Sequence, residues 1–198
     1  MWDRRYCEPG FAYGTEPNDF LVEAADRYLP PKGEILSLGE GEGRNAVYLA
    51  RRGFRVTGVD SSEVGLEKAL GLAEQHGVDI QTVVADLGKF ELGTSRWDGV
   101  VSMWCHLPPD LRGRVHRAVA AALKPGGVFL LEADRPNQLA LKTGGPSTAE
   151  VMMTLAAVRA ELAGLELLVG EEKLRAVHEG KHHDGVSAVL QVVARKPG

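Results

Sequence analysis

Three glycines stand where a short apolar run gives way to a helical pattern, a place suited to holding a small ligand. Gly39, Gly41 and Gly43 follow the run at 34–38 and precede the helical spacing at 46–52. Glycine lets the backbone approach a ligand closely, and the first turn of a helix offers unpaired N–H groups to an anion. Taken alone, this turn also fits a dinucleotide site or a plain tight connection.

Two aspartates indicate which kind of ligand the site would bind. Asp60 follows an apolar run at 55–59, and Asp86 follows another at 80–85. A carboxylate after the second strand can accept both hydroxyls of a ribose, and an acceptor after the third suits an adenine amino group. Each aspartate by itself could be an ordinary turn or cap residue. Because the carboxyl ends of parallel strands meet at one sheet edge, the three segments together predict a nucleoside site there.

The elements that must position these residues follow from the apolar patterning. Apolar runs alternate with helical patterns in five βα-type repeats, and the first runs are apolar almost throughout, which is typical of strands covered on both faces. After a polar loop expected at 134–146, two strands follow a helix with no helix between them, which predicts an antiparallel hairpin. We therefore expect an α/β fold with a doubly wound seven-stranded sheet, mostly parallel and closed by a C-terminal hairpin. The expected strands are 34–38, 55–59, 80–85, 97–103, 127–131, 165–177 and 186–194. The expected helices are 20–28, 46–52, 62–76, 109–123 and 154–164.

Length and composition limit the number of domains, the partners and the location that we expect. The chain has 198 residues, of which 44% are hydrophobic, and we expect a single domain over 1–198 with an N-terminal arm and lead-in helix at 1–31. A formal charge of −4 and the lack of a Lys/Arg cluster disfavour nucleic acid as a partner. No apolar run approaches the roughly 18 residues needed to span a bilayer, so we expect no membrane partner and a cytoplasmic location. The patterns allow either a monomer or a homodimer.

Over nearly its whole length the chain resembles the class I S-adenosylmethionine-dependent methyltransferases, which have a Rossmann-like fold. The residues that carry the resemblance are Gly39-x-Gly41-x-Gly43, Asp60, Asp86-Leu87 and Leu123-Lys124-Pro125-Gly126-Gly127-Val128. Other segments resemble the tellurite-resistance and thiopurine branch of small methyltransferases. They are Trp2-Asp3-x-x-Tyr6, Tyr13-Gly14-Thr15-Glu16-Pro17-Asn18, Gly43-Arg44-Asn45, Cys105-His106-Leu107-Pro108 and Gly144-Gly145-Pro146.

The resemblance implies an enzyme that binds S-adenosylmethionine, releases S-adenosylhomocysteine and methylates a small-molecule acceptor by in-line transfer. It further implies that Gly39 and Gly41 lie beneath the methionine part of the cofactor and that Asp60 holds the ribose. Asp86 and the Leu87 backbone would then bind the adenine.

The resemblance also assigns the N-terminal arm to the cofactor, with Tyr6 and Tyr13 folding over it as a lid. Two positions depart from the family pattern, because Ser37 stands where many members have an acidic residue and Glu40 adds a negative charge. The complete set of predicted cofactor residues is Tyr6, Tyr13, Gly39, Glu40, Gly41, Asn45, Asp60, Ser61, Asp86 and Leu87.

The acceptor is expected beside the strand at 97–103. Trp104 and His106 are the candidates for a catalytic role, and Cys105, His106 and His178 are the candidates for substrate contacts. Protonated imidazoles at His106 and near the final hairpin could hold an anionic acceptor, with a titration near pH 6.5. The hairpin histidines lack an acidic partner pattern, so no metal site is expected.

Two other functions remain open from the residues alone. A nicotinamide-dependent oxidoreductase could use Gly41, Gly43 and Ala46 as its dinucleotide turn. A non-catalytic cofactor-binding protein on the same fold is the second, because a fold does not settle function. Within the methyltransferase interpretation, a thiolate or chalcogen oxyanion needs no base, whereas a neutral amine or hydroxyl acceptor needs one.

Overall fold

The structure is a computed structural model that describes residues 2–198, and its elements alternate as the apolar patterning predicts. The strands are β1 (Glu34–Leu38), β2 (Arg55–Asp60), β3 (Gln81–Val84), β4 (Trp97–Met103), β5 (Leu123–Asp134), β6 (Glu166–His178) and β7 (Asp184–Arg195). The α-helices are α1 (Trp2–Tyr6), α2 (Asp19–Tyr28), α3 (Arg44–Arg51), α4 (Glu63–Gln75), α5 (Pro109–Ala122), α6 (Gln138–Leu141) and α7 (Leu155–Glu161). Short 3-10 turns lie at η1 (Ala149–Val151) and η2 (Gly180–His182).

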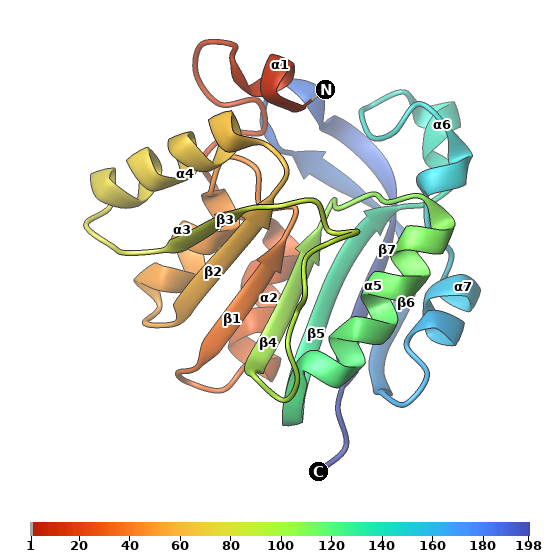
Figure 1. Ribbon diagram of the computed structural model, residues 1–198. Helices are drawn as coiled ribbons and strands as arrows, with labels where there is room; N and C mark the ends of the chain where they lie inside the picture. Colours follow the sequence, from red (N-terminus) through yellow and green to blue (C-terminus); the bar gives the residue numbers. More distant parts are fainter. Residues whose placement is uncertain (1) are drawn as a thin grey trace.

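In the described residues the strands form one seven-stranded sheet in the order β3-β2-β1-β4-β5-β7-β6. The first five strands along this order pair in parallel, whereas β7 pairs antiparallel with both β5 and β6. This confirms the predicted doubly wound sheet with its antiparallel hairpin. Since β1 and β2 start in register at Glu34 and Arg55, the loops that follow the parallel strands emerge at the same edge (Figure 1).

Helices cover both faces of the sheet, so the parallel strands are buried on both sides. Apolar residues of α2, α3 and α4 pack with Ile35, Val56 and Val101 on one face. Apolar residues of α5 and α7 pack with Leu36 and Phe129 on the other. Figure 1 shows this arrangement, with α5 in green before the sheet and α2 behind it. In β1 the alternation of Ile35 and Leu36 therefore sends successive side chains to opposite cores.

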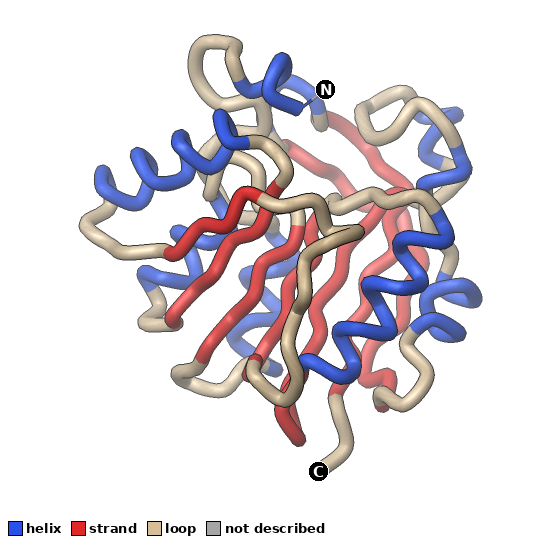
Figure 2. Tube along the Cα trace, viewed as in Figure 1, coloured by secondary structure: helices blue, strands red, loops and turns tan. Residues whose placement is uncertain are grey.

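One of the five predicted βα-type repeats is incomplete, because β3 connects to β4 through residues 85–96 without a helix. The connection crosses the face of the sheet as an extended segment (Figure 2). Phe90 and Leu92 pack into the core on that face, and the Trp97 indole donates a hydrogen bond to the Leu92 carbonyl at 2.7 Å. These side chains bury the sheet surface that a helix would otherwise cover.

The strand β5 is longer than the predicted run at 127–131 and extends to Asp134. It continues because β7 pairs with it up to the register Asp134–Val189, after pairing with β4 has ended at Met103–Glu132. The apolar pattern does not predict this extension, because it contains the polar residues Glu132 and Asp134. Both side chains are nevertheless fully buried. The expected loop at 134–146 consequently starts as a strand end, and it also contains α6.

Candidate functional site

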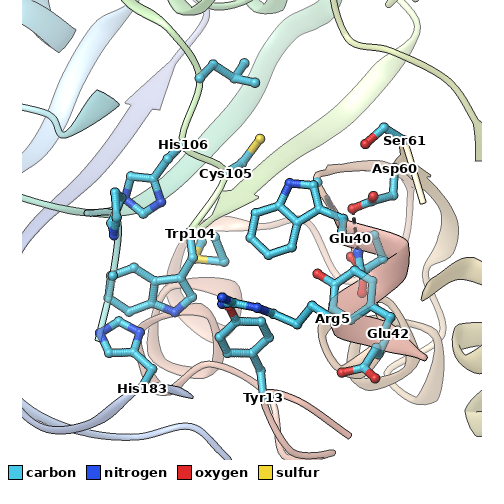
Figure 3. Close-up of a pocket in the computed structure, with 18 of the residues that line it drawn as sticks. Arg5, Tyr13, Glu40, Glu42, Asp60, Ser61, Trp104, Cys105, His106 and His183 are labelled. Carbon is cyan, nitrogen blue, oxygen red and sulfur yellow. Dashed lines mark hydrogen bonds between the residues drawn. The ribbon is translucent and has the colours of Figure 1, made fainter. Parts of the chain in front are cut away.

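A cavity of about 690 Å³ opens at the carboxyl edge of the parallel strands, a volume in the usual range for a ligand site. Figure 3 shows Glu40, Asp60 and Ser61 on one side of it and Trp104, His106 and His183 on the other. Every cofactor residue predicted from the sequence lines this cavity, as do the three residues predicted beside β4. They are Tyr6, Tyr13, Gly39, Glu40, Gly41, Asn45, Asp60, Ser61, Asp86 and Leu87, with Trp104, Cys105 and His106.

The glycine turn between β1 and α3 forms the floor of the cavity. Gly39 and Gly41 have φ of 64° and 62°, in the left-handed region that favours glycine. A Cβ at Gly39 would come within 2.8 Å of the Cys105 sulfur, and a Cβ at Gly41 within 2.7 Å of the Tyr6 hydroxyl oxygen. Both glycines are therefore required by backbone conformation and by space, which leaves a bare backbone facing the cavity.

Asp60 is the last residue of β2, as predicted, whereas Asp86 lies two residues beyond the end of β3 at Val84. Asp60 is buried and accepts hydrogen bonds from the backbone amides of Gly41 at 2.9 Å and Ser62 at 2.8 Å. Burial raises its pKa, while these amides oppose that shift. Asp86 is exposed, and its Oδ1 accepts from the Gly88 amide at 2.7 Å. Both carboxylates keep further acceptor capacity for a ligand.

The Glu40 side chain is buried, and its Oε1 accepts a hydrogen bond from the Ala46 amide at 2.9 Å in the first turn of α3. Burial raises the pKa of Glu40 to about 7. The negative charge that the sequence places beside the glycine turn is therefore reduced near neutral pH.

The N-terminal arm closes one wall of the cavity. Tyr6 is buried over Gly41, and Trp2 stacks on the Tyr6 ring at a centroid distance of 5.7 Å. The Arg5 guanidinium donates a hydrogen bond to the Tyr13 hydroxyl at 2.7 Å. The arm is held by polar contacts to the core, including Ala12 N to Glu42 Oε2 at 2.7 Å. Trp2 and Arg5 thus present an indole and a cation to the cavity; Trp2 enters the sequence analysis only as part of a family motif, and Arg5 is not predicted there.

A buried ionic network joins segments that are distant in sequence. The Glu132 carboxylate accepts from Asn18 Nδ2 at 2.5 Å and from Arg175 Nη2 at 2.6 Å. The Glu179 carboxylate accepts from Asn18 Nδ2 at 2.9 Å and from Arg175 Nη2 at 3.2 Å. Glu179 also pairs with Arg44 of α3. The two glutamates and two arginines balance in charge, which is the condition under which such groups are stably buried.

Trp104 connects this network to the cavity. Its indole donates a hydrogen bond to Glu179 Oε2 at 2.6 Å, and its ring meets that of His183 edge-on at a centroid distance of 4.4 Å. The Trp104 backbone has φ of 57°, an uncommon conformation for a large side chain, and its amide is fixed by a 2.9 Å hydrogen bond to the Glu132 carbonyl. The strained turn directs the chain from β4 along the cavity wall.

His106 and His183 flank the carboxyl group of Asp134. His106 Nε2 lies 3.4 Å from Asp134 Oδ2, and His183 Nε2 lies 3.7 Å from Oδ1. Burial lowers the pKa of both imidazoles to about 4, so both are neutral at physiological pH. This corrects the expectation that a protonated His106 holds an anionic acceptor with a titration near pH 6.5.

Two of the predicted substrate residues are placed differently from His106. Cys105 lines the cavity, but burial raises its pKa to about 12, so its sulfur remains a thiol. His178 is exposed, contacts Asp184 at 2.6 Å and is not among the residues that line the cavity. The histidine that the hairpin brings to the cavity is His183, because η2 turns the chain back before β7 begins.

Several lining residues could not be identified as site residues from the sequence. Asp134 was expected to open a loop, and nothing in its local pattern distinguishes it from a turn residue. The Gly144-Gly145-Pro146 segment had been noticed only as a family motif, yet residues 145–148 line the cavity. The lining residues absent from the predicted set include Trp2, Arg5, Glu42, Arg44, Met103, Leu107, Asp134, Val151 and His183.

Comparisons with known proteins agree with this architecture. Residues 35–127 match the family described as methyltransferase domain. Thiopurine S-methyltransferase of Legionella pneumophila (strain Paris) is 24% identical over 213 residues, covering 98% of this chain and 95% of that protein. The 2-heptyl-1-hydroxyquinolin-4(1H)-one methyltransferase of Mycobacteroides abscessus is 28% identical over 102 residues. That match covers 50% of this chain and 45% of that protein, so it spans less than half of the relative.

The fold has been seen before in solved structures. TehB from Haemophilus influenzae superposes with a TM-score of 0.73 and 19% identity, covering 98% of this chain and 65% of that one. The methyltransferase domain at residues 35–127 and the methyltransferase relatives support an S-adenosylmethionine-dependent methyltransferase. The likeness to thiopurine S-methyltransferase extends over nearly the whole chain, and TehB shares its fold. The nicotinamide-dependent alternative is not favoured by these comparisons. In residues 2–198 no helix is long and apolar enough to cross a membrane.

Proposed function

We propose that this chain binds S-adenosylmethionine in the cavity at the carboxyl edge of its sheet and transfers the methyl group to a small acceptor, releasing S-adenosylhomocysteine. The observation that supports this most is the convergence of three strand ends on one cavity. The bare backbone at Gly39 and Gly41, the carboxylate of Asp60 and the open oxygen of Asp86 all face it.

The residues present fit such a cofactor. The Gly39–Gly41 backbone would lie against its methionine part, Asp60 would accept from the ribose hydroxyls, and Asp86 with Leu87 would contact the adenine. The rings of Trp2 and Tyr6 suit a positively charged sulfur. When bound, the cofactor supplies an electrophilic methyl group on that sulfur. The chain would align the acceptor with this group and exclude water, which is the main catalytic demand of an in-line transfer.

The shape of the cavity and the names of two relatives support a small acceptor. The cavity is closed on one side by the N-terminal arm and on another by residues 145–148, and apolar side chains such as Met103, Leu107 and Val151 line the remainder. The two curated relatives described above are named for a thiopurine and a quinolone, which are both compact heterocycles. A planar, weakly polar molecule fits such a wall better than a macromolecular segment does.

The test combines binding and turnover. Titration calorimetry should show binding of S-adenosylmethionine and S-adenosylhomocysteine, with NADH as the control that does not bind. Cofactor carrying a labelled methyl group should then transfer label to a member of a panel of thiols, amines, hydroxyl compounds, carboxylates and chalcogen oxyanions. Failure to bind either cofactor form would overturn the proposal. Binding without transfer to any acceptor would favour a non-catalytic cofactor-binding protein instead.

A further inference from the structure

A buried carboxyl group without a hydrogen-bond partner stands in the wall of the cavity. Asp134, the last residue of β5, is 0% exposed, and in the described residues neither of its carboxyl oxygens has a hydrogen-bond partner. The same side chain lines the cavity on the side of Trp104 and His106. Buried polar groups are nearly always paired, because leaving one unpaired costs free energy. An unpaired carboxyl group at a cavity therefore indicates a ligand that supplies the missing donor.

The neighbouring imidazoles do not supply it. His106 Nε2 accepts a hydrogen bond from the Asp134 backbone amide at 3.0 Å, so its lone pair is used and a neutral ring carries its proton on Nδ1. His183 Nε2 lies 3.2 Å from the Ser187 hydroxyl, closer than its 3.7 Å separation from Asp134. Both histidines are neutral, as shown above. The carboxyl group of Asp134 thus has two imidazole neighbours but receives no proton from either.

Other charges near Asp134 disfavour an anion in this part of the cavity. Its own strand carries Glu132, and Glu179 approaches from the β6–β7 connection; burial and these two carboxylates together raise the pKa of Asp134 to about 7. The arginines of that region, Arg44 and Arg175, are already paired with the two glutamates. Arg5 lies across the cavity beside Tyr13 (Figure 3).

The segment 144–145 closes the far side of the carboxyl group. A Cβ at Gly145 would lie 2.5 Å from Asp134 Oδ2, and a Cβ at Gly144 would lie 2.9 Å from the His183 Cα atom. Both glycines have positive φ, 129° at Gly144 and 87° at Gly145, and without a side chain their backbone packs directly on these residues. The Gly145 backbone thus covers this side of the carboxyl group, while Asp134 is also among the residues that line the cavity.

We propose that Asp134 is the acceptor-binding carboxylate of this enzyme, that it hydrogen-bonds a neutral N–H or O–H group of the methyl acceptor, and that it receives that proton during transfer. The inference rests on the proposed function. The acceptor nitrogen or oxygen forms a bond to the methyl carbon while the carbon–sulfur bond breaks and leaves its electron pair on sulfur. The proton released by the acceptor passes to an Asp134 oxygen. The substrate class is thus a small amine, N-heterocycle or hydroxyl compound, and not a thiolate or chalcogen oxyanion.

The experiment uses three probes that share one ring and differ in the nucleophilic atom: aniline, phenol and thiophenol. Binding of each to the protein saturated with S-adenosylhomocysteine is measured for the wild type, Asp134→Asn and the matched control Asp184→Asn, whose carboxylate lies outside the cavity. Asp134→Asn should weaken binding of aniline or phenol by roughly tenfold to a hundredfold. Asp184→Asn should leave it unchanged, and neither variant should change binding of S-adenosylhomocysteine.

Turnover gives the second measurement. With aniline or phenol, loss of the base in Asp134→Asn should lower kcat/KM by roughly a hundredfold to ten thousandfold. The wild-type kcat/KM should rise with pH through about 7, where Asp134 ionises, and this rise should be absent from Asp134→Asn, which keeps Glu40, the other cavity carboxyl group with a pKa of about 7. A pH-independent wild-type rate, equal binding in wild type and Asp134→Asn, or preference for thiophenol would each overturn the inference. If the wild type does not bind S-adenosylhomocysteine at all, the proposed function itself fails.

Discussion

The guanidinium of Arg44, in the first turn of α3, is paired with the carboxylate of Glu179, which lies 135 residues further along the chain. Arg44 follows the glycine turn that forms the floor of the cavity, and Glu179 also accepts a hydrogen bond from the indole of Trp104 on the wall beside β4. One buried ion pair therefore fixes the two halves of the site relative to each other.

Glu179→Gln should destabilise the fold, because it leaves Arg44 and Arg175 with less negative charge in a buried region. The expected loss of unfolding free energy at pH 7 is about 3 kcal/mol, measured by urea denaturation. Burial raises the pKa of Glu179, but Arg44, Trp104 and Arg175 together outweigh it and hold the pKa below its usual value. The carboxylate therefore contributes its stability above about pH 5, and the difference between wild type and variant should shrink as the pH falls below about 4. A difference that stays constant over this range would contradict the charge-based explanation.

Gly41→Ala should impair cofactor binding as well as stability. The new Cβ would meet the Tyr6 hydroxyl and displace the aromatic wall, in addition to the backbone strain of a positive φ, which is about 1–2 kcal/mol. Gly53→Ala is the matched control, since Gly53 also has a positive φ, 90°, but has open space around it. Both variants should lower Tm, and only Gly41→Ala should weaken binding of S-adenosylhomocysteine. Equal affinity in the two variants would show that Tyr6 does not contribute to cofactor binding.

Asp60→Ala should weaken binding of both cofactor forms through the loss of a carboxylate acceptor for the ribose. The expected cost is about 1.5–3 kcal/mol, or roughly tenfold to a hundredfold in the dissociation constant. Asp110→Ala is a suitable comparison, because Asp110 is exposed at the start of α5 and does not line the cavity. Calorimetry that finds the same affinity in the two variants would exclude Asp60 from cofactor binding.

Asp134→Asn should stabilise the unliganded protein in a pH-dependent way. The pKa of Asp134 is raised from its ordinary value to about 7 on folding, so the folded state disfavours the ionised form. The resulting penalty is absent below about pH 4, grows as the pH rises, and is complete above about pH 7. Thermal unfolding should show the variant level with wild type at pH 4 and more stable by roughly 2–4 kcal/mol at pH 8. A variant less stable than wild type at pH 8 would mean that the carboxylate has a partner inside the protein.

His106 and His183 should remain neutral between about pH 5.5 and 8.5, because their pKa values of about 4 lie below this range. Imidazole NMR resonances assigned through His106→Gln and His183→Gln should show no chemical-shift titration there. The KM of the acceptor should therefore have the same pH dependence in the wild type, His106→Gln and His183→Gln between about pH 5.5 and 8.5. A midpoint near pH 6.5 assigned to His106 would restore the alternative of an anionic acceptor held by a protonated imidazole.

The sequence by itself determined the sheet and the residues at its carboxyl edge. Short apolar runs between amphipathic helices predict a doubly wound sheet, since strands buried on both faces need apolar side chains at nearly every position. Gly39, Gly41, Asp60 and Asp86 could be placed at that edge because each stands at or shortly after the end of such a run. Parallel pairing then brings the ends of those strands to one edge, so local patterns were sufficient to predict that these residues meet.

The opposite wall of the cavity, beside β4, was decided only by the tertiary structure. Asp134 and His183 are distant in sequence, and they meet because β7 pairs antiparallel with β5 past the end of β4. The neutral state of His106 and the raised pKa of Asp134 come from burial, which depends on every segment packed around them. Residue type and spacing alone do not determine that packing. The sequence could therefore name histidines near this wall but could not determine their charge or identify the carboxyl group between them.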